Sequence, residues 1–191
     1  MLSPFVTALV FLINTVFGIY IFLVMLRFLL QWLQVGFRGD PIVRLLWKVT
    51  DPPLQLLYNF IPGWRNIDFA AIILMLALKM LELILNAVLG IILFSSITGL
   101  FLISIANLLS LLIYIFMFAI FIQVILSWIA PHSSYNNPLS NILYHLSEPL
   151  LRPVRGKIPP LQGIDLSPLV VIIALQLAEI VVVGLLQQLA Q

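Results

Sequence analysis

The sequence contains no cysteine, and charged residues occupy only 8% of its 191 positions. The absence of cysteine excludes disulfide bonds, thiol nucleophiles and cysteine-ligated metal centres. Soluble globular domains carry about 25% charged residues, so a soluble protein of this composition could not cover its own surface with polar groups. Hydrophobic residues make up 63% of the chain, and we therefore expect lipid to be its solvent.

The chain also lacks the signals of enzymes and of nucleic-acid binding proteins. The net charge is only +2, which argues against a nucleic-acid partner. There is no His-Glu-x-x-His helix, no Gly-x-Ser-x-Gly turn and no glycine-rich phosphate loop. Its two histidines, His132 and His145, lack carboxylate-rich surroundings, and haem or metal ligation by them is the less favoured alternative. We expect no enzyme, no cofactor and no metal.

Four long apolar segments predict transmembrane helices, since a helix needs about 20 mainly apolar residues to cross a bilayer. These segments cover residues 4–33, 68–93, 100–130 and 167–189. Small and polar residues at 95–99 predict the turn between the second and third helices. Ser167 and Pro168 predict the N-cap and the first position of the fourth helix. The predicted fold is an all-α polytopic membrane protein.

An internal repeat divides the chain into two units, residues 1–95 and 96–191. Acidic residues and prolines of the first unit match those of the second at an offset of 97 residues, and one tryptophan pair matches at an offset of 96. The matched pairs are Asp51 with Glu148, Pro52 with Pro149, Asp68 with Asp165, Glu82 with Glu179, and Trp32 with Trp128. Each unit is therefore predicted to be helix, loop, helix, with the two copies parallel about an axis along the membrane normal.

Each long loop is predicted to contain its own short helix. The helices should begin at Pro41 and Pro138 and end before Pro52 and Pro149, because a residue that precedes proline avoids the helical region. Apolar residues at helical spacing define one face of the first short helix: Ile42, Leu45, Leu46 and Val49. This face either lies in the membrane interface, with Trp47 and Tyr144 at headgroup depth, or packs on the protein's own helices.

Basic residues gather in the two loops, at 34–67 and 132–166. The main members are Arg44, Lys48, Arg152, Arg155 and Lys157, whereas the opposite side has no Lys or Arg. The positive-inside rule then places both loops in the cytoplasm and both termini outside. These cations are candidates for binding anionic lipid or a partner protein, and a role in topology alone is the alternative.

Four ionisable residues fall inside the predicted spans: Arg27, Lys79, Glu82 and Glu179. Such residues are functional candidates, because their insertion costs about 2.5–3.5 kcal/mol each. Lys79 and Glu82 stand at i, i+3 and should pair. Glu179 has no local cation, so we expect one from another helix, Arg27 or Lys79, although Arg27 lies close enough to the helix end to reach the interface. The group forms either a structural ion-pair network or a polar path for protons or cations.

Motifs in the second unit resemble the signature of the YggT family of small membrane proteins. They are Leu126-Ser-Trp128, Ser147-Glu-Pro-Leu-Leu-Arg-Pro-Val-Arg155, Ile158-Pro-Pro160 and Gly163-Ile-Asp-Leu-Ser-Pro168. The first unit is similar through Gln31-Trp32, Thr50-Asp-Pro-Pro-Leu54 and Asn66-Ile-Asp68. It departs at Gln55-Leu56, where the family has Arg-Pro, and at Ala70-Ala71, where the family has Ser-Pro.

The resemblance implies a multi-pass protein of the bacterial cytoplasmic membrane, with no catalytic residues to carry over. Bacterial members are linked to tolerance of osmotic stress, and plastid relatives to nucleoid distribution and cytochrome b maturation. We expect a non-enzymatic assembly or organising factor that acts through its basic loops. The alternative is an ion or small-solute conduit that uses Lys79, Glu82 and Glu179. The expected partners are membrane lipids, other membrane proteins and further copies of the chain.

Overall fold

The computed structural model describes residues 3–33, 41–59, 61, 67–91, 96–129, 138–158 and 165–190. Four helices in these ranges are long and apolar enough to cross a membrane: α1 (Pro4–Trp32), α3 (Phe69–Val88), α4 (Ile97–Ile129) and a fourth from Ser167 to Leu189. The fourth consists of α6 (Ser167–Ala178), the π-helical turn η2 (Glu179–Val183) and α7 (Gly184–Leu189). The loops contain α2 (Pro41–Tyr58) and α5 (Pro138–Arg155). The predicted all-α membrane fold is confirmed.

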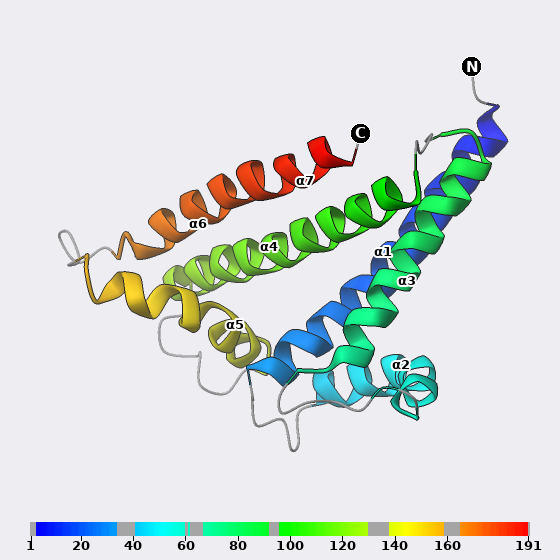
Figure 1. Cartoon of the computed structure of the whole chain (residues 1–191). Helices are drawn as coiled ribbons and strands as arrows, with labels where there is room; N and C mark the ends of the chain where they lie inside the picture. Colours follow the sequence, from blue (N-terminus) through cyan, green and yellow to red (C-terminus); the bar gives the residue numbers. More distant parts are fainter. Residues whose placement is uncertain are drawn as a thin grey trace.

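The spans form two helical hairpins, one from each repeat. In the first, α1 packs on α3, and in the second α4 packs on α6, η2 and α7. Figure 1 shows both chain termini at one end of the molecule and α2 and α5 at the other. We call the end with α2 and α5 the loop end, and the opposite one the terminal end. Both units therefore run in the same direction, as the repeat predicts.

The two hairpins meet along α3 and α4 and diverge toward the loop end (Figure 1). There α5 contacts α4, α6 and α1, so it bridges the second hairpin to the first. The buried core lies at this end in α1, where every buried residue falls between Ile21 and Leu30. The loop helices are therefore built into the protein's core.

The helix ends follow local capping signals, with some differences from the prediction. Ser3 caps α1 by accepting a hydrogen bond from the Val6 amide at 3.3 Å. The second span ends at Val88, short of residue 93, because Gly90 adopts a φ of 75° that suits glycine. The Ile91 amide then donates to the Asn86 carbonyl at 3.0 Å, which completes a Schellman-type C-cap.

The third span begins three residues earlier than predicted, at Ile97. The Ser96 hydroxyl accepts a hydrogen bond from the Gly99 amide at 3.0 Å, so Gly99 lies in the first helical turn and not in the connection. A Cβ at Gly99 would stand 2.6 Å from the carbonyl oxygen of Ala190. Glycine thus allows α4 to approach the end of α7 closely. Ser95 and the boundary between residues 95 and 96 lie outside the described residues, so that boundary stays a prediction.

The predicted cap of the fourth span is wrong. Helix α6 includes Ser167, whose hydroxyl is buried and has no hydrogen-bond partner among the described residues. Leu166 occupies the N-cap position without a side-chain hydrogen bond, and Asp165 before it accepts a hydrogen bond through Oδ1 from the Ser167 amide at 2.9 Å. Pro168 therefore stands second in the helix and not first as predicted, but still within the first turn, where its missing N–H costs nothing.

The loop helices continue past the prolines that were predicted to end them. Helix α2 contains Pro52 and Pro53, and α5 contains Pro149 and Pro153. Proline at 52 deprives the Lys48 carbonyl of its partner, but Lys48 is exposed, so water or headgroups can satisfy that carbonyl. The buried apolar face extends beyond the proline to Leu54, and this burial favours a continued helix. Figure 1 shows α5 changing direction part-way along.

Candidate functional site

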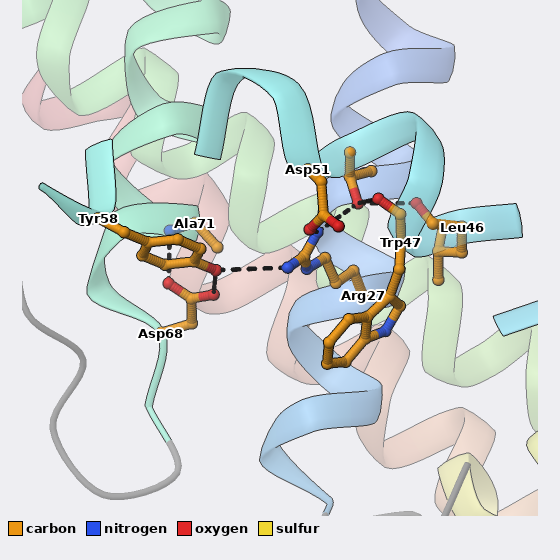
Figure 2. A network of polar contacts seen from close by, with 8 residues as sticks. Arg27, Leu46, Trp47, Asp51, Tyr58, Asp68 and Ala71 are labelled. Atoms are coloured by element: carbon orange, nitrogen blue, oxygen red, sulfur yellow. Dashed lines mark hydrogen bonds and ion pairs between the residues drawn. The ribbon is translucent and has the colours of Figure 1, made fainter. Parts of the chain in front are cut away.

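Arg27 is the centre of a buried polar network at the loop end of the first hairpin (Figure 2). It lies on α1 and is only 3% exposed. Its Nη1 stands 2.5 Å from Asp51 Oδ1 and donates to Thr50 Oγ1 at 2.8 Å. Both partners belong to α2, which folds back over the end of α1. The network therefore ties the loop helix to the first span.

Tyr58 extends the network to α3. The Arg27 Nη2 atom donates to the Tyr58 hydroxyl at 3.5 Å, and that hydroxyl donates to Asp68 Oδ2 (Figure 2). The other carboxylate oxygen of Asp68 accepts from the Ala71 amide at 3.0 Å and caps α3. Burial raises the pKa of Tyr58 to about 12, with further contributions from the hydrogen bond to Asp68 and its charge. The phenol therefore stays protonated and keeps donating at neutral pH.

Arg27 does not reach out to the interface as predicted. Its guanidinium lies over the ring of Trp47, with the Cζ atom 4.7 Å from the ring centroid. Four groups of α2, on Trp47, Thr50, Asp51 and Tyr58, thus surround a cation that the sequence placed near the end of a lipid-facing helix. Sequence reasoning missed this arrangement because it depends on how α2 folds back on α1.

The second repeat holds the matching acidic residues with a different cation. Arg155 donates from Nη1 to Glu148 Oε2 at 2.9 Å and from Nε to Asp165 Oδ2 at 2.8 Å. Burial alone would raise the pKa of Asp165, but the hydrogen bonds from Arg155 and Ser167 outweigh it, and the pKa lies below its usual value. Glu148 and Asp165 are the repeat mates of Asp51 and Asp68.

The repeat offsets explain how the two networks correspond. The mate of Arg27 at an offset of 96 is Gln123, which accepts a hydrogen bond from the Ser147 hydroxyl. Ser147 is the mate of Thr50 at an offset of 97, and Arg155 is the mate of Tyr58. The cation has therefore moved from the span to the loop helix. Extending the repeat comparison to positions 58 and 155 would have revealed this exchange from the sequence.

The intramembrane acids are held differently in the two hairpins. Lys79 Nζ lies 2.8 Å from Glu82 Oε1 and 3.0 Å from Oε2, as the i, i+3 spacing predicts. Glu179 accepts only from uncharged groups within the described residues. These are the hydroxyls of Ser110 at 3.0 Å and Tyr114 at 3.3 Å, and the amide of Gln176 at 3.4 Å. The predicted cation from Arg27 or Lys79 is absent from Glu179, because both cations pair elsewhere.

Helix α2 has two adjacent apolar faces. One contains Val43, Leu46 and Leu54 and is buried against the bundle. The other is exposed and consists of Ile42, Leu45, Val49 and Leu56. Of the four residues predicted to form a single face, Leu46 alone is buried. The helix therefore packs on the protein and still offers an apolar face to its surroundings.

Exposed cations and aromatic rings accompany this apolar face. Arg44, Lys48, Arg152 and Lys157 are exposed and have no ion-pair partner in the part of the chain that the structure describes. Exposed aromatic residues at the loop end include Trp32, Trp47, Trp128 and Tyr144. Tryptophan and tyrosine collect at membrane–water interfaces, where their rings sit at headgroup level.

The described residues contain no cluster of His, Asp and Glu that could hold a metal ion. The ring of His145 makes an edge contact with Tyr144, with ring centroids 5.7 Å apart. His132 lies outside the described residues, and so do residues 159–164, which belong to the family motifs of the second unit.

Comparison with known proteins supports the division of the chain into two repeated units. A sequence model of the CCB3/YggT family matches residues 6–89 and again residues 102–186. The chain belongs to the CCB3/YggT family. The YggT protein of Escherichia coli is 33% identical over 183 residues, covering 94% of this chain and 91% of that protein. A functionally uncharacterised protein of Pseudomonas aeruginosa is 36% identical over 179 residues, covering 93% and 89%.

A shorter similarity links this chain to the ycf19 protein of Porphyra purpurea. The two are 37% identical over 62 residues, which is 32% of this chain and 64% of that protein. A single repeat unit is therefore enough to carry that similarity. No solved structure matches this chain. The family assignment confirms the resemblance drawn from the motifs and supports a multi-pass membrane protein.

Proposed function

We propose that this protein is a non-enzymatic organising factor of the bacterial cytoplasmic membrane, which binds other membrane proteins or anionic lipid through its loop helices. The observation that carries the proposal is the exposed apolar face of α2 together with exposed cations on α2 and at the end of α5, which have no ion-pair partner among the described residues. Both loops face the cytoplasm in this proposal, in agreement with the positive-inside rule. The chain acts without a catalytic group or cofactor, and its loss is felt under osmotic stress.

The chemistry of the loop helices suits a membrane surface. An apolar face beside cations binds an interface through buried area and through attraction to anionic lipid, at about 1 kcal/mol per basic residue near the surface. Arg27 and its partners fix α2 against α1 and α3. A rigid platform binds with less loss of conformational freedom than a flexible loop.

A conduit for ions is the second candidate, and one observation favours it. Glu179 lies inside the fourth span without a cation among the described residues. Against it, Lys79 neutralises Glu82 within one helix turn. Another polar contact in the spans, from Asn86 to Asn14 at 2.8 Å, joins α1 to α3 inside one hairpin. The polar contacts of Glu82 and Asn86 thus stay within the first hairpin and those of Glu179 within the second, which argues against one shared polar path.

The test is purification in mild detergent from native membranes at natural expression, with the co-purifying proteins and lipids quantified. The informative variant combines Arg152→Gln with Lys157→Gln, because these cations are exposed and unpaired while Arg155 already binds Glu148 and Asp165. We expect a membrane-protein partner at stoichiometric level with the native chain and its loss from this variant. The control variant changes Gln187 and Gln188 to Ala at the terminal end, and should keep the partner.

Two results would contradict this proposal. A partner retained in full by the neutralised variant would show that these cations do not bind it. A clean homo-oligomer without any partner or enriched anionic lipid would favour the conduit. Ion flux into liposomes, abolished by Glu179→Gln, would then decide for that alternative.

A further inference from the structure

The two hairpins and the loop helix α5 border an open apolar groove. Its volume is about 620 Å³, and its walls come from α1, α4, α5 and α6. Six of the lining residues represent these walls: Phe22, Leu26, Tyr114, Phe118, Leu143 and Ile172. The hairpins diverge toward the loop end and α5 contacts both of them (Figure 1), and the residues that line the groove belong to these helices.

Glu179 lies beside this groove. It stands two helical turns from the groove-lining Ile172, on the same face of the fourth span. It also accepts a hydrogen bond from Tyr114, which is 49% exposed and lines the groove. Glu179 is not itself a lining residue, but its carboxylate lies next to the apolar groove through this contact with Tyr114.

The depth of Glu179 limits what could neutralise it. It is the thirteenth of 23 residues in the span from Ser167 to Leu189. At about 1.5 Å of rise per residue, it lies roughly 15–18 Å along the helix from either end, far from lipid headgroups and water. Its hydrogen-bond partners, Ser110, Tyr114 and Gln176, bring no positive charge.

The fourth span is also irregular at this residue. Glu179 begins the π-helical turn η2, the one such turn in the described helices. Single π turns inside α-helices weaken the local hydrogen-bond ladder and often occur at functional sites. Glu82, its repeat mate, lies in regular helix and has its own cation in Lys79.

We propose that the groove between the hairpins binds a transmembrane helix of another protein, and that a basic residue near the middle of that helix pairs with Glu179. This inference rests on the proposed function, in which the chain binds other membrane proteins, and it assigns the partner's chemistry. An acyl chain could fill the groove but could not supply the cation. Packing and interhelical polar contacts drive helix association in lipid, and this site offers both.

The test uses synthetic transmembrane peptides with the full-length protein in neutral phosphatidylcholine vesicles. One peptide is a Leu-Ala helix with a central Lys, and the matched peptide has Leu at that position. Because the chain has no cysteine, Gln188→Cys gives a single labelling site at the terminal end for energy transfer to the labelled peptide. We expect the Lys peptide to bind at least tenfold more tightly than the Leu peptide.

Three variants and one control variant locate the binding. Glu179→Gln should reduce the preference for Lys to less than twofold, and Glu179→Lys should transfer it to a peptide with a central Glu. The control that combines Lys79→Gln with Glu82→Gln should keep the preference, since that pair is already neutral. Leu111→Trp, which fills the groove, should weaken both peptides. Circular dichroism and size-exclusion profiles identify any variant that fails to fold.

Equal binding of the two peptides, or a Lys preference that survives Glu179→Gln, would overturn this proposal. Unchanged binding after Leu111→Trp would do the same, because the peptide would then lie elsewhere. The Arg152→Gln, Lys157→Gln variant should bind the Lys peptide normally. Failure of the peptide test is therefore distinguishable from failure of the proposed function, in which the loop helices bind partners, because that function is judged by co-purification.

Discussion

The two repeats hold equivalent acidic residues with cations that come from different helices. In the first repeat the cation is Arg27 on a transmembrane helix, and its side chain is 4% exposed. In the second it is Arg155 on a loop helix, and its side chain is 38% exposed. In both cases a cation bridges the loop helix to its hairpin. The comparison shows that the repeat preserves the connection while the residue that makes it has changed place.

Exposure makes the two connections unequal in energy. Removing one partner of a buried ion pair costs about 3–5 kcal/mol, because the other charge is left unpaired. An exposed pair contributes about 0–1 kcal/mol, since water and salt screen it. The first loop helix should therefore be held much more firmly than the second.

The largest effect is expected from Arg27→Gln. This change leaves the partly exposed carboxylate of Asp51 without its cation and removes the donor to the buried Thr50, so we expect a loss of about 2–4 kcal/mol in unfolding free energy. Unfolding of the purified protein in mixed micelles, followed by circular dichroism, measures it. Arg155→Gln is the matched control, and equal losses from the two changes would remove the distinction between the repeats.

A double variant tests whether the exchange of cation position is real. Tyr58→Arg added to Arg27→Gln gives the first repeat the arrangement of the second, with Gln on the span and Arg on the loop helix. We expect it to recover about half of the lost stability, because an arginine at 58 can bridge Asp51 and Asp68 as Arg155 bridges Glu148 and Asp165. Additive losses from the two changes would show that the networks are not equivalent.

The terminal end of the second hairpin offers a further contrast. There Gly99 allows α4 to approach Ala190, whereas the first hairpin is joined by Asn14 and Asn86. Gly99→Ala should cost about 1–3 kcal/mol, since the new methyl group meets a backbone carbonyl. Thermal unfolding checks this, with Gly18→Ala as the control because a Cβ there has open space. A neutral Gly99→Ala would mean that the approach relaxes easily.

The effect of pH should separate the repeats. The pKa of Asp165 is lowered on folding, so its contribution is present above the unfolded pKa and is lost as pH falls through the folded value. The pKa of Tyr58 is raised to about 12, so its contribution is present below the unfolded value and lost as pH rises through 12. Tyr58→Phe should therefore reduce the loss of unfolding free energy between pH 10 and 12 and leave the loss at acid pH unchanged. Unfolding curves across pH measure both changes.

The smallest effect is expected from Arg155→Gln at neutral pH, a loss of less than about 1 kcal/mol. The unfolding free energy of this variant should also depend less on pH in the acid range, because Asp165 would lose the hydrogen bond that lowers its pKa. Measuring the unfolding free energy at two salt concentrations sharpens the comparison. Only the exposed pair of the second repeat should weaken as salt rises.

The sequence predicted the elements of the fold better than their connections. Hydropathy located the four spans, and the repeat located both loop helices. The predicted stop at Pro52 failed because burial of residues beyond it, such as Leu54, outweighs a local preference. The partners of Arg27 could not be read from spacing, because Asp51 reaches it only after α2 folds back over α1. The absence of a cation from Glu179 among the described residues likewise depends on tertiary contacts, which spacing along the sequence does not reveal.

The distribution of burial along α1 bears on how this protein responds to bilayer thickness. None of the described residues before Ile21 is buried, so the terminal half of this helix packs less closely on the protein than the loop half and is joined to α3 by the hydrogen bond between Asn14 and Asn86. The terminal half can therefore tilt at smaller cost than the loop half. In a thinner or thicker bilayer, the mismatch should be absorbed mainly at the terminal end, while α2 and α5 at the loop end keep their positions.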